Sequence, residues 1–162
     1  MSERLGGADG VPAAPAAGSD GAVLRLQEVE VRYGPVPALR EVTMEVRKGE
    51  IVCLLGGNAS GKSTTMKAVM GAVRCARGSV WYEGQEITAW PTSRRVRSGI
   101  AIVPEARRIF PRLSVLENLM MGAFTRRDRP EIEGDLDHVM GLFPRLRERR
   151  TQAGGKIGRA HV

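Results

Sequence analysis

The alternation of apolar and polar residues predicts two strands near the start of the chain. Residues 23–31 alternate with one slip at Gln27-Glu28, as expected of a half-buried strand with a bulge. The sequence Tyr33-Gly34-Pro35 then breaks the pattern. Residues 42–47 alternate again up to a turn at Lys48-Gly49. We expect the two strands to pair as antiparallel neighbours.

Two further runs are apolar without alternation. Residues 51–55 and 99–103 are typical of strands that are covered on both faces of a parallel sheet. Between them, apolar residues repeat at helical spacing over 66–73, which predicts an amphipathic helix. Residues 79–88 predict a hairpin that turns at Gly84.

The last third of the chain favours helices. The sequence Ser114-Val115-Leu116-Glu117 is a capping box, and an apolar stripe follows it. A second helix is expected from Pro130 to Pro144, with apolar residues along one face. Stripes of Met and Leu usually form a core or a docking surface for another subunit, and rarely a cofactor site.

Composition places the chain among soluble globular proteins. Its 162 residues are 42% hydrophobic, enough for one domain with a sizeable core. No run approaches the roughly 18 consecutive apolar residues of a membrane helix, so we expect a cytoplasmic protein. Residues 1–22 are rich in Gly, Ala and Pro and predict a disordered extension. Cys53 and Cys75 lack metal-ligand spacing and are expected to be buried thiols.

The net charge of +7 allows several acidic partners, including nucleic acid or an anionic membrane. Aromatic residues make up only 4% of the chain, and the basic residues form scattered clusters instead of one stripe. Nucleic-acid binding is therefore a minor alternative, and we expect no nucleic-acid partner.

A phosphate-binding loop connects the apolar run 51–55 to the predicted helix. The stretch 56–64 contains the pattern G-x-x-x-x-G-K-[ST], in which a curled backbone and a helix N-terminus direct N–H groups at phosphate. Lys62 would supply positive charge to the phosphates, and the Ser63 hydroxyl would be a ligand for Mg²⁺. The predicted binding residues are Gly56, Gly57, Asn58, Ala59, Ser60, Gly61, Lys62, Ser63 and Thr64.

Several stretches resemble the nucleotide-binding subunit of ABC transporters. The residues that carry this resemblance are Tyr33-Gly34, Ala38-Leu39, 41–52, the phosphate loop with Thr64-Thr65, and Gly78-Ser79-Val80. Residues 102–124, from Ile102-Val103-Pro104-Glu105 to Met121-Gly122-Ala123-Phe124, are similar to the subfamily that imports branched-chain amino acids. The resemblance extends from Val23 to about Gly154.

This resemblance implies roles for further residues. Tyr33 would stack on the adenine of ATP, against the alternative of an ordinary buried tyrosine. Glu105 lies where the family usually has Gln and would help to bind Mg²⁺. The helical region 114–143 would dock onto a membrane permease subunit, with a second ATP-binding subunit completing the assembly. Such a subunit is cytoplasmic and peripheral, on the inner face of the plasma membrane.

The chain also departs from the family pattern. Ala59 replaces a glycine, and a positive φ there would cost about 1 kcal/mol or more. The Leu-Ser-Gly-Gly-Gln-type signature, the acidic strand with its catalytic Glu (Walker B) and the switch His are absent from the sequence. We therefore assign no catalytic residue, and we expect weak Mg-ATP binding and no turnover by this chain alone.

The predicted fold class is α/β, a P-loop NTPase with an incomplete RecA-like parallel sheet, an antiparallel β-subdomain and a helical subdomain. The expected domains are an extension (1–22), a partial nucleotide-binding domain (23–154) and a divergent tail (155–162). The predicted function is that of a truncated ATP-binding subunit, by family an ATPase, of an importer for branched-chain amino acids or related amides. The alternative is a non-catalytic nucleotide-binding or regulatory module that associates with a full-length partner.

Overall fold

The computed structural model describes residues 21–105 and 108–157, which fall into two units. Unit 1 extends to Ala101 and unit 2 begins at Ile102. The predicted extension over 1–22 lies outside the described residues except for its last two positions. The tail predicted over 155–162 is described only to residue 157, and the predicted domain boundaries stay predictions.

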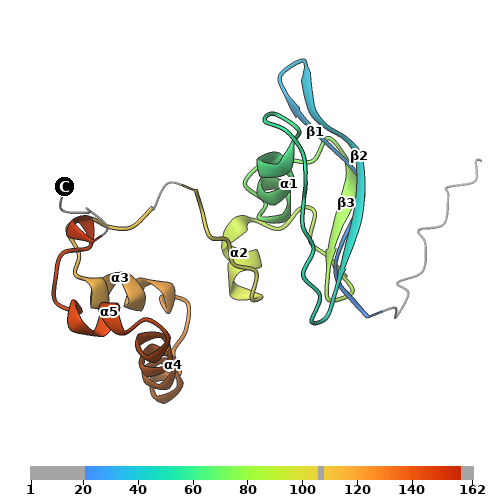
Figure 1. Cartoon of the computed structure of the whole chain (residues 1–162). Helices are drawn as coiled ribbons and strands as arrows, with labels where there is room; N and C mark the ends of the chain where they lie inside the picture. The colour runs from blue at the N-terminus through green and yellow to red at the C-terminus, as the bar shows by residue number, and fades with distance from the viewer. Residues whose placement is uncertain (1–20, 106–107, 158–162) are drawn as a thin grey trace, which may run out of the picture. The chain divides into compact units, whose positions relative to one another are not determined.

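Unit 1 is built on a four-stranded antiparallel sheet with the strand order β2-β1-β3-β4 (Figure 1). The strands are β1 (Ala22–Tyr33), β2 (Val36–Arg47), β3 (Arg77–Tyr82) and β4 (Gln85–Glu86). The predicted pairing of the first two strands and the predicted hairpin over 79–88 are both confirmed.

The predicted slip in the first strand is a real irregularity. The register between β1 and β2 shifts between Leu26 and Val29, and Glu28 has a φ of 48°. The Glu28 N–H keeps a hydrogen-bond partner in the sheet, because it donates to Thr43 Oγ1 of β2 at 3.0 Å. The shift lets Leu26 and Val29 both point into the core, where both are fully buried.

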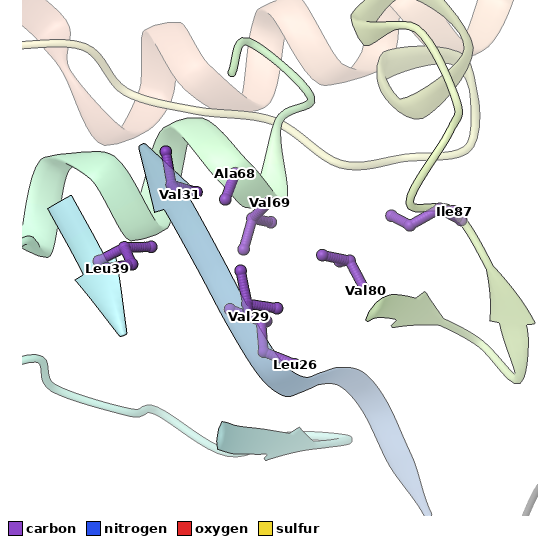
Figure 2. Packing of buried hydrophobic residues seen from close by; sticks show 8 residues of the cluster. All are labelled: Leu26, Val29, Val31, Leu39, Ala68, Val69, Val80 and Ile87. Atoms are coloured by element: carbon purple, nitrogen blue, oxygen red, sulfur yellow. The ribbon is translucent and has the colours of Figure 1, made fainter. Parts of the chain in front are cut away.

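Helix α1 (Lys62–Val69) covers one face of this sheet (Figure 1). Figure 2 shows the core between them, with Ala68 and Val69 of α1 directed toward the side chains of β1. The buried cluster consists of Leu26, Val29, Val31, Leu39, Ala68, Val69, Val80 and Ile87. A helix after the loop is thus confirmed, but it ends at Val69, so Val73 lies outside it, and Met66 is 44% exposed. Burial of Ala68 and Val69 stabilises this short helix. Helix α2 (Thr92–Arg97) follows β4.

The two continuous apolar runs do not form the predicted parallel strands. Residues 51–55 and 99–103 contain no strand, and Ile51 and Leu55 are each 91% exposed. A parallel strand is stable only with hydrogen-bonded neighbours and cover on both faces, and the sheet of the described residues is entirely antiparallel. The expectation of a buried thiol is therefore wrong for Cys53, which is exposed, whereas Cys75 is half-buried.

Unit 2 is helical, as predicted. It contains α3 (Val115–Gly122), α4 (Arg129–Leu142), α5 (Pro144–Glu148) and a 3₁₀ turn, η1 (Gly154–Lys156). The predicted capping box at the start of α3 is present, because Ser114 and Glu117 each accept a hydrogen bond from the other's backbone N–H. Pro130 lies in the first turn of α4 and Pro144 follows its end.

The segment before α3 is tied to the end of the described chain. Gly154 N donates to Leu113 O at 2.7 Å, and Val115 N donates to Gln152 O at 2.9 Å. Asn118 joins in through its side-chain amide, which donates to Phe110 O at 3.0 Å. Gly154 is buried here, and a Cβ on it would lie 2.9 Å from Asn118 Nδ2. Unit 2 therefore closes on itself through backbone bonds.

Across the described ranges, none of the helices is long and apolar enough to span a membrane.

The capping box makes the stability of unit 2 dependent on pH. The hydrogen bonds from Ser114 hold the pKa of the Glu117 carboxyl below its ordinary value of 4.5. A lowered pKa in the folded state contributes stability above the unfolded-state pKa, and that stability is lost as the pH falls through the folded-state value. We expect Glu117→Gln to destabilise the protein at pH 7 and to differ less from the original protein as the pH falls below about 4.5.

Chemical denaturation at a series of pH values measures this difference in the free energy of unfolding. Glu133→Gln, an exposed position on α4, is the matched control and should leave the stability nearly unchanged. A destabilisation by Glu117→Gln that is as large at pH 3 as at pH 7 would contradict the assignment.

Candidate phosphate-binding site

The predicted phosphate loop is an exposed, curled segment that ends at α1. Residues 51–60 are all exposed, and no strand or helix interrupts them before Lys62. Three residues with a positive φ bend the loop, Gly56 with φ 155°, Ala59 with φ 63° and Gly61 with φ 91°. Gly57, Asn58 and Ser60 complete the curve, which a hydrogen bond from Ser60 N to Gly57 O closes at 3.4 Å.

The N-terminus of α1 is left without a cap. Gly61 occupies the cap position and offers no side chain, and the first turn contains no acidic residue. Within the described residues, the N–H groups of Lys62, Ser63 and Thr64 donate to no protein acceptor, whereas Thr65 N donates to Gly61 O at 2.8 Å. Unpaired N–H groups at the positive end of a helix dipole are a binding site for an anion.

Lys62 turns back over the loop. Its ammonium donates to Gly56 O at 2.7 Å, to Gly57 O at 2.6 Å and to Ser60 Oγ at 3.2 Å. These acceptors are neutral, so the positive charge is held over the curve of the loop without a carboxylate partner in the described residues. The loop thus combines a cation with unpaired N–H groups.

The sheet fixes the place of the loop. A Cβ on Gly61 would lie 2.7 Å from Leu39 Cδ2 and 3.1 Å from Ala38 O, so a glycine is needed where the loop passes β2. Leu39 is itself paired with Val31 of β1. The loop is therefore held against the same end of the hairpin that carries Tyr33.

Tyr33 lies at the end of β1, where it pairs with Val36 across the hairpin turn. Its side chain is 47% exposed, which excludes the alternative of an ordinary buried tyrosine. An exposed aromatic face near the loop is suited to stacking on a base. Tyr33 and the phosphate loop belong to one unit, and Gly61 of the loop lies against Leu39, whose partner Val31 is two residues before Tyr33 in β1.

Two predicted magnesium ligands differ in their placement. Ser63, in the first turn of α1, is exposed and follows Lys62 directly, so its hydroxyl is available as a hard oxygen ligand. Glu105 is exposed and belongs to unit 2, which is described separately from the loop. The described residues hold no group of three or more acidic, His or Cys side chains that could bind a metal.

Arg95 is a buried residue that the sequence did not reveal. It is 1% exposed and lies beneath the last turn of α1, where its guanidinium donates to Ala68 O and Val69 O. Burial lowers the pKa of Arg95 and raises that of the neighbouring Cys75 thiol, and the charge of each group opposes the other's shift. The carbonyls at the end of a helix need hydrogen-bond donors, but the sequence does not show which side chain supplies them.

The sequence profile described as ABC transporter matches residues 39–158. Among curated proteins, the chain is 46% identical to the high-affinity branched-chain amino acid transport ATP-binding protein BraG of Pseudomonas aeruginosa, over 83% of this chain and 58% of the relative. It is 33% identical to the probable branched-chain amino acid transport ATP-binding protein LivF of Archaeoglobus fulgidus, over 83% of this chain and 57% of that protein. The chain thus spans less than two thirds of the length of these relatives.

Solved structures give the same match. An ATP-binding subunit of an ABC transporter superposes with a TM-score of 0.72 at 29% identity, over 81% of this chain and 54% of that one. A nucleotide-free ATP-binding cassette from an ABC transporter superposes with a TM-score of 0.68 at 22% identity, which shows likeness of fold alone. That superposition covers 84% of this chain and 59% of the cassette.

Ala59 is strained, as predicted from its replacement of a glycine. Its φ of 63° lies in the left-handed region, where a Cβ costs about 1 kcal/mol. We expect Ala59→Gly to raise the free energy of unfolding by up to about 1 kcal/mol. Chemical denaturation measures the change. The control is Ala72→Gly, at an exposed position without a positive φ, which should destabilise instead. Equal destabilisation by both changes would show that Ala59 carries no strain.

Proposed function

Because the chain belongs to the ABC transporter family, we propose that it binds Mg-ATP through the loop 56–64, as part of the ATP-binding subunit of an importer. Membership of the family confirms the predicted fold class, the P-loop NTPase fold. The described residues contain its antiparallel subdomain, the phosphate loop with α1 and the helices of unit 2, without parallel strands.

The uncapped N-terminus of α1 under the Lys62 ammonium is the observation that carries the proposal. A phosphate entering the loop would accept hydrogen bonds from the N–H groups of Lys62, Ser63 and Thr64, which have no other acceptor in the described residues. Lys62 would exchange the carbonyls of Gly56 and Gly57 for charged phosphate oxygens. The ammonium is charged in both states, so the gain comes from replacing neutral carbonyl acceptors by anionic phosphate oxygens, which adds attraction between opposite charges.

The remaining nucleotide contacts follow from the same site. The exposed ring of Tyr33 would stack on adenine, since any base offers a flat π face. The Ser63 hydroxyl would bind Mg²⁺. Glu105 stays a proposed Mg²⁺ ligand on the family resemblance alone, because units 1 and 2 are described separately. The magnesium ion would neutralise phosphate charge when it is bound. An ionised Glu105 accepts but does not donate hydrogen bonds, so it could not orient an attacking water as an amide would.

The transported solute and the partners are inferred from relatives. BraG and LivF are both described as branched-chain amino acid transport proteins, and we extend branched-chain amino acids or related amides to this chain. A membrane permease subunit would dock on the helical region 114–143, and a second ATP-binding subunit would face the phosphate loop. The assembled protein would lie on the inner face of the plasma membrane. Exposed apolar side chains on and around α3 and α4 support a docking role, namely Met120, Met121, Phe124, Leu142 and Phe143.

The proposal for this chain is nucleotide binding, with hydrolysis assigned to the whole importer. In-line attack of water on the γ-phosphate needs positioning and charge neutralisation. The described residues contain the phosphate loop and the helices of unit 2. The exposed apolar side chains of those helices also suit the second candidate function, a non-catalytic nucleotide-binding or regulatory module that associates with a full-length partner.

Lys62→Ala tests the proposal. Removing the ammonium deletes the charged contact to phosphate, and we expect the dissociation constant for Mg-ATP to rise at least about tenfold. Calorimetric titration of the full chain measures this constant. The matched control is Lys67→Ala, which removes an exposed lysine from the last turn of the same helix and should leave affinity unchanged. Equal affinity of the Lys62→Ala variant and the original chain would contradict the proposed site.

A further inference from the structure

Arg95 is the largest fully buried side chain among the residues that the structure describes. It is 1% exposed, and its guanidinium donates only to backbone carbonyls. Two of them end α1, Ala68 O at 2.8 Å and Val69 O at 2.7 Å. The other two belong to the segment between β4 and α2, Thr88 O at 2.9 Å and Trp90 O at 3.1 Å. One side chain thus joins α1 to the segment that precedes α2.

This arginine is buried without a carboxylate partner in the part of the chain that the structure describes. Burying a charge costs several kcal/mol unless hydrogen bonds replace its hydration. The carbonyls provide that replacement, and the negative end of the α1 dipole adds to it. The arrangement therefore holds only while the end of α1 stays against Arg95.

The end of α1 needs Arg95 in turn. Gly71 N donates to Ala68 O at 3.0 Å and Ala72 N donates to Lys67 O at 2.8 Å, which is a Schellman motif. These backbone bonds leave Val69 O unused, and Arg95 binds it. Gly71 permits the approach, since its φ is 67° and a Cβ there would lie 2.8 Å from Arg95 Nε.

We propose that Arg95 is a positioning residue for the phosphate site at the opposite end of α1. Helix α1 has eight residues and is therefore about 12 Å long at 1.5 Å per residue. A helix this short is marginal by itself, and its direction depends on what holds its two ends. Gly61 rests against β2 at one end, and Arg95 holds the carbonyls at the other. The anchored axis keeps the N–H groups of Lys62, Ser63 and Thr64 directed at the loop. The inference rests on the proposed binding of Mg-ATP.

A positioning role and a merely structural role predict different results. If Arg95 only stabilises the fold, its loss lowers the folded fraction, and the molecules that remain folded bind nucleotide as before. If Arg95 positions α1, folded molecules bind less tightly, because a small misplacement of hydrogen-bond donors weakens the site. The amide of Thr65 reports on the same change, since its bond to Gly61 O closes the first turn far from Arg95.

The experiment compares Arg95→Met with Arg94→Met in the full chain. Arg94 is the matched control, because it is exposed and lies 3.7 Å over the Trp90 ring without contacting α1 carbonyls. Calorimetry with Mg-ATP gives the dissociation constant and the stoichiometry separately. Hydrogen exchange without nucleotide gives the protection of the Thr65 amide. The amide of Leu26, a fully buried residue of the central strand β1, is the reference for global folding.

We expect Arg95→Met to raise the dissociation constant about tenfold at unchanged stoichiometry and to speed exchange at Thr65 but not at Leu26. Arg94→Met should change neither quantity. An unchanged dissociation constant with unchanged Thr65 exchange would overturn the proposal. If Arg95→Met also speeds exchange at Leu26, the two measurements are made on Arg95→Lys, which keeps the charge but reaches fewer carbonyls, and the same criteria apply.

The two proposals fail separately. If the original chain binds no Mg-ATP, the proposed function is wrong. The exchange rate of the Thr65 amide then still decides whether Arg95 holds the loop end of α1.

Discussion

The packing of α1 against β1 and β2 is the interaction on which the candidate site depends. Val29 and Val31 of β1 meet Ala68 and Val69 of α1 in a dry core, so the helix cannot rotate without exposing them. The sheet in turn places β2 beside Gly61, at the start of the helix. Two interactions therefore set the position of the phosphate loop. One is the burial of the apolar side chains of α1 against the sheet, and the other is the hydrogen bonding of Arg95 to carbonyls at the far end of α1.

Local patterns predicted local structure well. The alternation and slip of β1, the hairpin at Gly84 and the capping box of Ser114 and Glu117 each depend on residues close in sequence. The runs 51–55 and 99–103 were predicted to be parallel strands, and this was wrong for the structure described. Their pattern states only that they are apolar, whereas strand formation requires partners from distant parts of a sheet.

In the candidate site too, the sequence predicted features that depend on residues close in sequence and missed those that depend on the folded structure. The pattern of glycines and lysine predicted the loop, and the replacement of glycine by Ala59 predicted a strained backbone that the structure contains. No sequence pattern predicted that Lys62 would bind Gly56 and Gly57 carbonyls, or that Arg95 and not Arg94 would be buried. Both depend on which side chain faces a helix end in three dimensions. For the same reason, the placement of Glu105 in a separate unit could not be read from its motif.

The central claim is that the loop 56–64 binds the phosphates of ATP through backbone N–H groups at the start of α1. Amide chemical shifts of the isotopically labelled chain, recorded by NMR during titration with Mg-ATP and separately with adenosine, test it most directly. The account predicts large Mg-ATP-dependent shifts for Gly61, Lys62, Ser63 and Thr64, and none of comparable size with adenosine. Shifts confined to residues outside the loop, or no shifts with Mg-ATP, would contradict it.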